Sequence, residues 1–238
     1  MVEVSASILS LKDENVIQAL YNLETAGIDY FHIDVMDGEF VKNNTVNKML
    51  EYCEYLNSIS NLPLDVHLMV KDVPSYVSSF LVFEPNIITF HLEAAKEKES
   101  EALDEKLKQK LLSENEKRKI FEWIKLIKQN NVRVGISVKP DTKIEEVKDF
   151  LPFIHLVLVM TVEPGEGGQQ IIPKTVEKIR ALKQYVKTQG LEVDIEADGG
   201  INVETVDMIK QAGADILVSG SGIVKSDNYA EAVEKLKK

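Results

Sequence analysis

The stretch Tyr30–Gly38, Tyr-Phe-His-Ile-Asp-Val-Met-Asp-Gly, combines side chains that could do chemistry with the pattern of a β-strand. Apolar residues alternate with His32, Asp34 and Met36, so one face of this strand is apolar and the other carries an imidazole, a carboxylate and a thioether. Burying an imidazole and a carboxylate is costly unless a partner binds them. A divalent metal ion is the simplest such partner, because both groups are metal ligands.

Two later apolar runs add polar residues of the same kind. His67 lies in Leu64–Val70, and Asp198 lies in Asp194–Gly200. The predicted ligand set is therefore His32, Asp34, His67 and Asp198. Two imidazoles and two carboxylates suit Zn²⁺, Fe²⁺, Mn²⁺ or Co²⁺, and they leave coordination positions open for substrate oxygens.

The two aspartates of this set could also move protons. If Asp34 and Asp198 face each other across the substrate, a carbon acid next to a carbonyl could lose its proton to one and regain it from the other. The metal would act as the Lewis acid for the enediolate oxygens. Inverting a stereocentre needs two bases on opposite faces, whereas a one-base isomerase does not. The alternative is that Asp198 only caps a helix beginning near Asn202.

Eight short apolar runs recur along the chain, and each is followed by a stretch with helical spacing. The runs are Glu3–Leu9, Tyr30–Val35, Leu64–Val70, Ile87–Glu93, Arg133–Lys139, Leu156–Val162, Asp194–Gly200 and Ile216–Gly222. The predicted helices are Val16–Thr25, Val46–Leu56, Val73–Phe83, one within Leu103–Gln129, Ile144–Phe150, Thr175–Thr188, Val203–Gln211 and Tyr229–Lys237. Eight such repeats predict an α/β protein, a single (β/α)₈ TIM barrel, whose active site lies where the strands end. An open doubly wound sheet is the alternative, weakened because no Gly-x-Gly-x-x-Gly turn follows the first run.

Composition fits one barrel. The chain has 238 residues, 44% of them hydrophobic, close to the roughly 250 residues typical of this fold. A net charge of -11 argues against nucleic-acid and anionic-membrane partners. Cys53 is the single cysteine, predicted to lie in the core, so no intramolecular disulfide forms. We see no signal peptide and no apolar run of about 20 residues, and we expect a cytoplasmic protein.

Three glycine-bearing turns follow the last three apolar runs, at Gly165–Gly168, Gly199–Gly200 and Gly220–Gly222. Backbone amides in such turns can hold a phosphate without a cationic side chain. The loops after strands seven and eight are the usual phosphate site of this barrel. The sequence therefore favours a phosphorylated substrate.

One segment stands outside the barrel pattern. Residues 94–118 are dense in Lys and Glu, and Leu103, Leu107 and Leu111 have the spacing of a surface helix. We predict a charged helical insertion within the single domain 1–238. It could be a solvated extension, a lid over the barrel mouth or an oligomer contact.

These residues resemble the ribulose-phosphate 3-epimerase family across nearly the whole chain and in family order. The matching motifs are Ser7-Ile-Leu-Ser10, His32–Gly38, Leu64–Val70, His91-Leu-Glu-Ala94, Met160–Gly165, Gly167-Gly-Gln169, Glu196–Gly200 and Gly220-Ser221. The resemblance implies a metal-dependent isomerase of the pentose phosphate pathway that interconverts ribulose 5-phosphate and xylulose 5-phosphate. It also implies a homo-oligomer, with a dimer favoured.

The resemblance implies roles for particular residues. Asp34 and Asp198 would be the acid and base as well as metal ligands. The residues expected to contact the substrate are Ser7, Met36, Met69, Met160 and His91. The residues expected to line the phosphate site are Gly165, Gly167, Gly168, Gly199, Gly200, Gly220 and Ser221.

The chain departs from the family in the loops that are expected to recognise the length of the substrate and its phosphate. Glu166 stands where the family's glycine loop has Phe, Lys42 replaces Pro in the loop after the second strand, and residues 94–118 are extra. An epimerase of a related hexulose phosphate, such as D-allulose 6-phosphate, is therefore an alternative. A non-catalytic sugar-phosphate binder is another, although a binder has no use for two opposed bases. A lyase or decarboxylase barrel would need a lysine-bearing strand pattern that we do not find.

Overall fold

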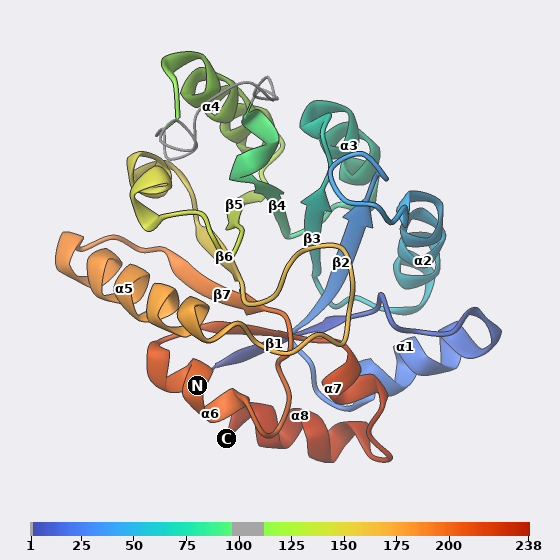
Figure 1. Cartoon of the computed structure of the whole chain (residues 1–238). Coiled ribbons are helices and arrows are strands. Elements are labelled where there is room, and N and C mark those ends of the chain that lie inside the picture. The colour runs from blue at the N-terminus through green and yellow to red at the C-terminus, as the bar shows by residue number, and fades with distance from the viewer. Residues whose placement is uncertain (1, 97–111) are drawn as a thin grey trace.

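A computed structural model of the protein describes residues 2–96 and 112–238. Eight parallel strands close into a barrel in sequence order, each paired with the next and β8 with β1 (Figure 1). The strands are β1 Glu3–Ser7, β2 Tyr30–Met36, β3 Leu64–Met69, β4 Ile87–His91, β5 Arg133–Val138, β6 Leu156–Met160, β7 Asp194–Asp198 and β8 Ile216–Ser219. The predicted (β/α)₈ barrel is confirmed, and each predicted run contains a strand.

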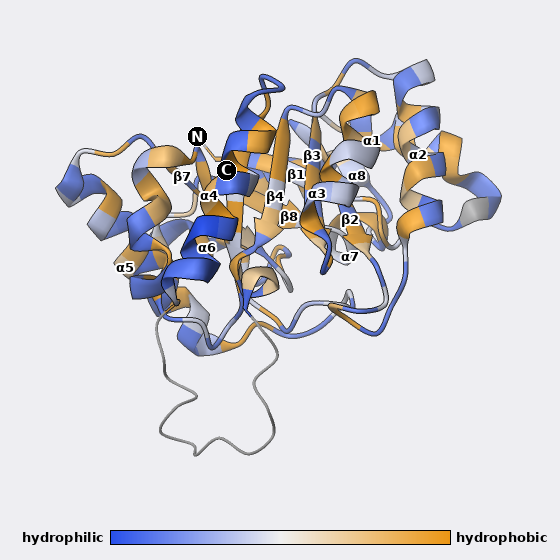
Figure 2. Ribbon diagram, turned by 90° about the horizontal axis from the view of Figure 1, so that it is seen from above, coloured by the Kyte–Doolittle hydropathy of each residue, from blue (hydrophilic) through white to orange (hydrophobic). Residues whose placement is uncertain are grey.

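Helices surround the barrel and follow the strands (Figure 1). They are α1 Val16–Thr25, α2 Val46–Ile59, α3 Val73–Phe80, α4 Glu114–Lys128, α5 Pro173–Gln189, α6 Val206–Ala212, α7 Ser221–Val224 and α8 Tyr229–Lys237. Figure 2 shows the apolar residues gathered on the strands and on the helix faces that cover them, with polar residues outside. This is the arrangement that amphipathic helices adopt around a parallel sheet.

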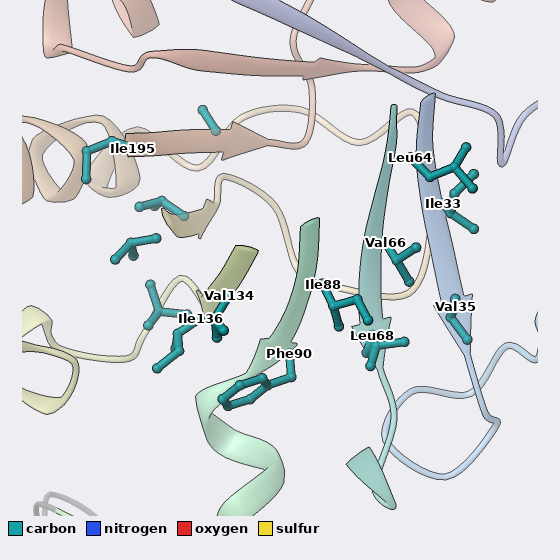
Figure 3. Packing of buried hydrophobic residues seen from close by; sticks show 14 of the residues in the cluster. Ile33, Val35, Leu64, Val66, Leu68, Ile88, Phe90, Val134, Ile136 and Ile195 are labelled. Atoms are coloured by element: carbon teal, nitrogen blue, oxygen red, sulfur yellow. The ribbon is translucent and has the colours of Figure 1, made fainter. Parts of the chain in front are cut away.

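The main core lies between strands and helices. Val66 and Leu68 of β3, and Ile88 and Phe90 of β4, point outward into this layer and are completely buried (Figure 3). Because side chains alternate along a strand, Asp65 and His67 of β3 must point into the barrel. The apolar layer outside the barrel therefore fixes which polar residues lie inside it.

The inside of the barrel is divided into a polar and an apolar part. A separate buried apolar cluster fills one part and consists of Tyr30, Ile87, Leu156, Leu158, Met160, Val162 and Ile216. Polar side chains on β1, β2, β3 and β7 fill the other and are also buried, including Ser5, His32, Asp65 and Glu196. Such a polar interior is costly in a barrel core, so it indicates a functional site.

Two predicted helices differ from the structure in an informative way. Residues 144–150 form 3₁₀ turns, Ile144–Glu146 and Lys148–Phe153, instead of an α-helix. Pro152 lies inside the second turn and has no N–H to continue an α-helix. The helix predicted from Val203 begins at Val206, since the chain leaves β7 through a glycine turn and a turn at Asn202–Thr205.

The predicted helix with Leu103, Leu107 and Leu111 lies outside the described residues. Of the predicted insertion, the structure describes a 3₁₀ turn at Leu92–Ala95 and residues from 112 onward, where Glu114–Arg118 form the first part of α4. Ser113 and Glu116 form a capping box that starts this helix.

Cys53 is completely buried in α2, as predicted, and burial raises its pKa to about 12. Within residues 2–96 and 112–238, none of the helices has the length and apolar character of a membrane span.

Candidate active site

Strand register brings the predicted metal ligands together. Asp34 of β2 pairs with His67 of β3, and His32 lies two residues before Asp34 on the same face. Asp198 ends β7 and reaches the same point, with one carboxylate oxygen 3.4 Å from His67 Nδ1 and 3.9 Å from His32 Nε2. Asp34 lies 3.5 Å from each of the same two nitrogens. The two carboxylates therefore share one pair of imidazole nitrogens.

The donor set fits a divalent metal ion. One potential ligand atom from each of His32, Asp34, His67 and Asp198 lies within 4.8 Å of all the others. His32 Nε2 and His67 Nδ1 are buried and have no hydrogen-bond partner among the described residues. Two unpartnered imidazole nitrogens facing two carboxylates need a cation or protons between them. The prediction that Asp198 only caps a helix is not supported, because α6 begins eight residues later.

A second carboxylate holds His32 from behind. His32 Nδ1 lies 2.6 Å from Asp65 Oδ2, which also accepts a hydrogen bond from the Ser5 hydroxyl. An ionised carboxylate only accepts hydrogen bonds, so Nδ1 carries the proton toward Asp65 and Nε2 faces the cluster. Burial lowers the pKa of His32, but the charges of Asp65 and Asp34 outweigh it and raise that pKa well above its usual value.

A buried acid, Glu196, lies in the same layer as Asp65. Its side chain is completely buried, 3.9 Å from His32 Nδ1, and neither carboxyl oxygen has a partner among the described residues. Burial, and then the charge of Asp65, raise the pKa of Glu196 well above its usual value. Both effects favour the neutral acid form of Glu196 over the carboxylate.

Asp34 and Asp198 are held differently. The Ser7 hydroxyl donates to Asp34 Oδ2 at 2.6 Å, which leaves Oδ1 for the cluster. Burial raises the pKa of Asp34, but the neighbouring imidazoles outweigh it and hold that pKa well below the usual range. Asp198 is positioned through its backbone, since its carbonyl accepts from the N–H and the hydroxyl of Thr161. Both aspartates are thus fixed at the floor of a cavity.

That cavity opens above the cluster at the C-terminal ends of the strands. Its walls include the predicted residues Ser7, Asp34, Met36, Met69, Met160, Asp198, Gly165, Gly167, Gly168, Gly199, Gly200, Gly220 and Ser221. Residues that sequence reasoning missed are Leu9, Ser10, Val162, Ile201 and Val218. Most of these are apolar, and each lies within three positions of a predicted residue, so their place near those residues could have indicated them.

A sequence model described as "Ribulose-phosphate 3 epimerase family" matches residues 3–111 and 110–224 of this chain. The chain belongs to the ribulose-phosphate 3-epimerase family. It is 35% identical to the "Ribulose-phosphate 3-epimerase" of Methanocaldococcus jannaschii, with 100% of this chain and 90% of that protein covered. The Escherichia coli protein of the same name is 32% identical, with coverage of 98% and 94%. The prediction of an epimerase, and so of an isomerase acting on carbohydrates, is confirmed.

Solved structures outside the family share its fold. The 3-keto-L-gulonate-6-phosphate decarboxylase from Vibrio cholerae superposes with a TM-score of 0.68 at 10% identity, covering 100% of this chain and 96% of that one. A 3-hexulose-6-phosphate synthase superposes with a TM-score of 0.67 at 12% identity, covering 99% and 98%. Identities this low show the barrel and nothing about the reaction.

In this epimerase-family chain His91 does not line the cavity. The structure buries it completely behind His67, with the two rings stacked and Nε2 of His67 3.0 Å from Nε2 of His91. The Phe40 ring covers His91 at a centroid distance of 4.8 Å. Burial lowers the pKa of His91 to about 4, so this ring is neutral. Its position does not support the predicted substrate contact.

Two loops meet over the mouth of the barrel. The loop from β6 to α5 runs across the barrel end toward β2 in Figure 1. There the side-chain amide of Asn43 donates to the Gly165 carbonyl at 2.7 Å. Gly165 has φ +117°, and a Cβ there would lie 3.1 Å from Val41 Cβ. The close approach of the two loops explains why this position is glycine.

We expect Gly199→Ala to damage both stability and the cavity. Gly199 has φ +118°, and an added Cβ would lie 2.4 Å from Val162 Cγ2. Strain and crowding together should lower the free energy of unfolding by about 2–4 kcal/mol. The KM for a phosphorylated substrate should rise, because Gly199 directly follows Asp198 and lines the cavity.

Urea unfolding and steady-state kinetics would measure the two effects of Gly199→Ala. Gly190→Ala is the matched control, since Gly190 also has a positive φ of +64° but nothing lies within 4 Å of its added Cβ. This control should lose only about 1 kcal/mol and keep its KM. Equal losses in the two variants would mean that the contact with Val162 is unimportant.

Proposed function

We propose that this protein interconverts D-ribulose 5-phosphate and D-xylulose 5-phosphate, a reaction of the pentose phosphate pathway, by two-base proton transfer at C3. The observation that carries the proposal is the pair Asp34 and Asp198, which approach one cluster of imidazole nitrogens from different strands at the floor of a glycine-lined cavity. Epimerisation needs a base on each face of the carbon, and two aspartates on opposite sides of a bound sugar supply them.

The residues His32, Asp34, His67 and Asp198 would hold the divalent cation. When bound there, Zn²⁺, Fe²⁺, Mn²⁺ or Co²⁺ would stabilise the negative charge of the enediolate at C2 and C3. The protein's own contribution is the orientation of its ligands, with Asp65 behind His32 and Ser7 beside Asp34.

Proton transfer would then be the work of the two aspartates. Asp34 is ionised, since its pKa lies well below the usual range, and can accept the C3 proton of one epimer. Asp198, in its acid form, would deliver a proton to the opposite face of C3, and in the reverse reaction the two aspartates exchange these roles. Met36, Met69 and Met160 line the cavity beside both groups and would keep water from the reacting carbon.

Phosphate would be bound by backbone amides. The turns with Gly167, Gly168, Gly199, Gly200, Gly220 and Ser221 line the same cavity as the aspartates. Gly165 also lines it, where the two loops meet. Positive φ at Gly168, Gly199 and Gly200 orients successive amides in ways that other residues rarely adopt. A phosphate here would fix the sugar with its C3 near the cluster.

The direct test is incubation of the metal-supplied protein with ribulose 5-phosphate, followed by detection of xylulose 5-phosphate. D-allulose 6-phosphate is assayed in parallel, and kcat/KM should be higher for the pentulose. A higher kcat/KM for allulose 6-phosphate would favour the hexulose alternative. Binding of either sugar with no conversion would favour a non-catalytic binder and overturn the proposal.

We expect Glu166→Gln to lower the KM for the phosphorylated substrate by roughly two- to fivefold while leaving kcat unchanged. Glu166 is exposed and lines the cavity among the glycine turns, where its charge would repel phosphate. The effect should shrink as ionic strength rises, because salt screens exposed charges. Glu163→Gln is the control, since Glu163 is also exposed but does not line this cavity. An unchanged KM would place the Glu166 carboxylate away from the phosphate.

The assembly of the protein stays a prediction. Family membership favours a homo-oligomer, with a dimer first, and size-exclusion chromatography with light scattering would measure it. The role of the predicted insertion, 94–118, is likewise a prediction, and deletion within it followed by the same assay would test it.

A further inference from the structure

Behind His67 lies a row of groups that the reaction itself does not use. His67 Nε2 lies 3.0 Å from His91 Nε2, and His91 Nδ1 lies 3.2 Å from Glu93 Oε2. Both rings are completely buried. The row therefore begins at the predicted metal ligand His67, continues through the imidazole of His91 and ends at the carboxylate of Glu93.

The other carboxylate oxygen of Glu93, Oε1, accepts two hydrogen bonds. The backbone N–H of Lys139 donates to Glu93 Oε1 at 2.8 Å, and the Thr142 hydroxyl donates to the same oxygen. A backbone N–H can only donate, so Oε1 is fixed as an acceptor. Glu93 Oε2 is thereby the oxygen left for His91.

Each hydrogen bond in the row determines which atom is the donor in the next one. A carboxylate oxygen accepts, so His91 Nδ1 carries a proton. Nε2 of His91 faces Nε2 of His67 at 3.0 Å, so the two nitrogens share one proton. Because His91 already carries its proton on Nδ1, a neutral pair of rings places the shared proton on Nε2 of His67, which donates to His91. A neutral His67 that carries its proton on Nε2 has a bare lone pair on Nδ1, the atom that lies 3.4–3.5 Å from Asp198 and Asp34.

We propose that Glu93 and His91 are positioning residues for the metal site, which set the tautomer of His67 so that its Nδ1 lone pair faces the cation. This inference rests on the proposed function, in which His67 is a metal ligand. It parallels the role of Asp65 behind His32, but it acts through an intervening imidazole.

The substitution Glu93→Gln should exchange donor and acceptor in each hydrogen bond of the row. The Gln carbonyl must take the place of Oε1, because the Lys139 N–H needs an acceptor, so the amide NH₂ faces His91 Nδ1. His91 Nδ1 then accepts, its Nε2–H donates to His67 Nε2, and His67 is left with its proton on Nδ1. That proton occupies the position of the cation, so metal binding must break one of these hydrogen bonds.

The first experiment measures Zn²⁺ affinity by competition with a chromophoric chelator. Glu93→Gln should weaken Zn²⁺ binding by about 10- to 100-fold, the range found for partners of metal-binding histidines. Thr142→Val is the matched control, since it removes one donor to Oε1 but keeps the carboxylate, and it should change the affinity by no more than a few-fold. His67→Ala should weaken Zn²⁺ binding at least as much as Glu93→Gln.

The second measurement needs no variant. Long-range ¹⁵N–¹H NMR of the Zn²⁺-loaded protein should show a proton on Nε2 of His67 and on Nδ1 of His91. A proton on Nε2 of His91, or a folded Glu93→Gln variant with native Zn²⁺ affinity, would overturn the inference. If Glu93→Gln does not fold, the NMR result decides alone. Native Zn²⁺ affinity in His67→Ala would instead overturn the metal ligands of the proposed function.

Discussion

Asp34→Asn and Asp198→Asn are each expected to lower the turnover of ribulose 5-phosphate by about 10²–10⁴-fold. An amide cannot accept the C3 proton, so each variant keeps a base on only one face of the carbon. The remaining aspartate can still remove a proton from its own face and return it there. Each variant should therefore exchange the C3 hydrogen of one ketose with solvent deuterium without inverting it, and the two variants should act on different ketoses.

Mass spectrometry of each ketose after incubation in D₂O would measure this exchange. Metal content is determined on the same samples, because both aspartates are also proposed ligands. Asp194→Asn is the matched control, since Asp194 begins the strand that Asp198 ends and pairs with Arg133 at the other end of the barrel. The control should keep near-native turnover. Near-native turnover in Asp34→Asn or Asp198→Asn would refute the two-base mechanism.

The four predicted ligands could be found from sequence because two regular features determine their positions. Period-two alternation separates His32 and Asp34 from the outward Ile33 and Val35, which are completely buried against the helices. The barrel rule then places the ends of all eight strands at one mouth, so Asp198 could be grouped with His67, 131 positions earlier in the chain. Neither feature depends on the details of packing.

Depth within the barrel could not be predicted in the same way. His91 has the same alternation as His67, yet Phe40 from the β2–α2 loop covers it and a carboxylate in the following 3₁₀ turn occupies its second nitrogen. Asp65 and Glu196 are inward-facing polar residues like the ligands, but each lies two residues before a ligand on its own strand, Asp65 before His67 and Glu196 before Asp198. Contacts such as Ser5 with Asp65 join residues 60 positions apart, and only the register of the closed sheet brings them together.

Removal of the divalent metal is the second change expected to abolish activity. Dialysis against a strong chelator should lower turnover by at least about two orders of magnitude, since the charge of the enediolate would be left beside the carboxylates of Asp34 and Asp198 with no cation to neutralise it. One equivalent of a suitable divalent ion should restore it. Circular dichroism of the stripped protein should be unchanged, because the barrel core lies outside the site. Full turnover in protein shown to be metal-free would contradict the proposed mechanism.

Metal binding should also depend on pH in a direction that the site determines. Without metal, burial lowers the pKa of His32, but the charges of Asp65 and Asp34 raise it well above its usual value, so the ring holds its proton to a higher pH than a free imidazole. A cation must displace that proton from Nε2. Affinity for Zn²⁺ should therefore rise with pH by about tenfold per unit for each proton released, up to the pKa of His32. Chelator competition between pH 6 and 8 measures how Zn²⁺ affinity changes with pH. An affinity that does not change over this range would show that Nε2 of His32 carries no proton before the metal binds.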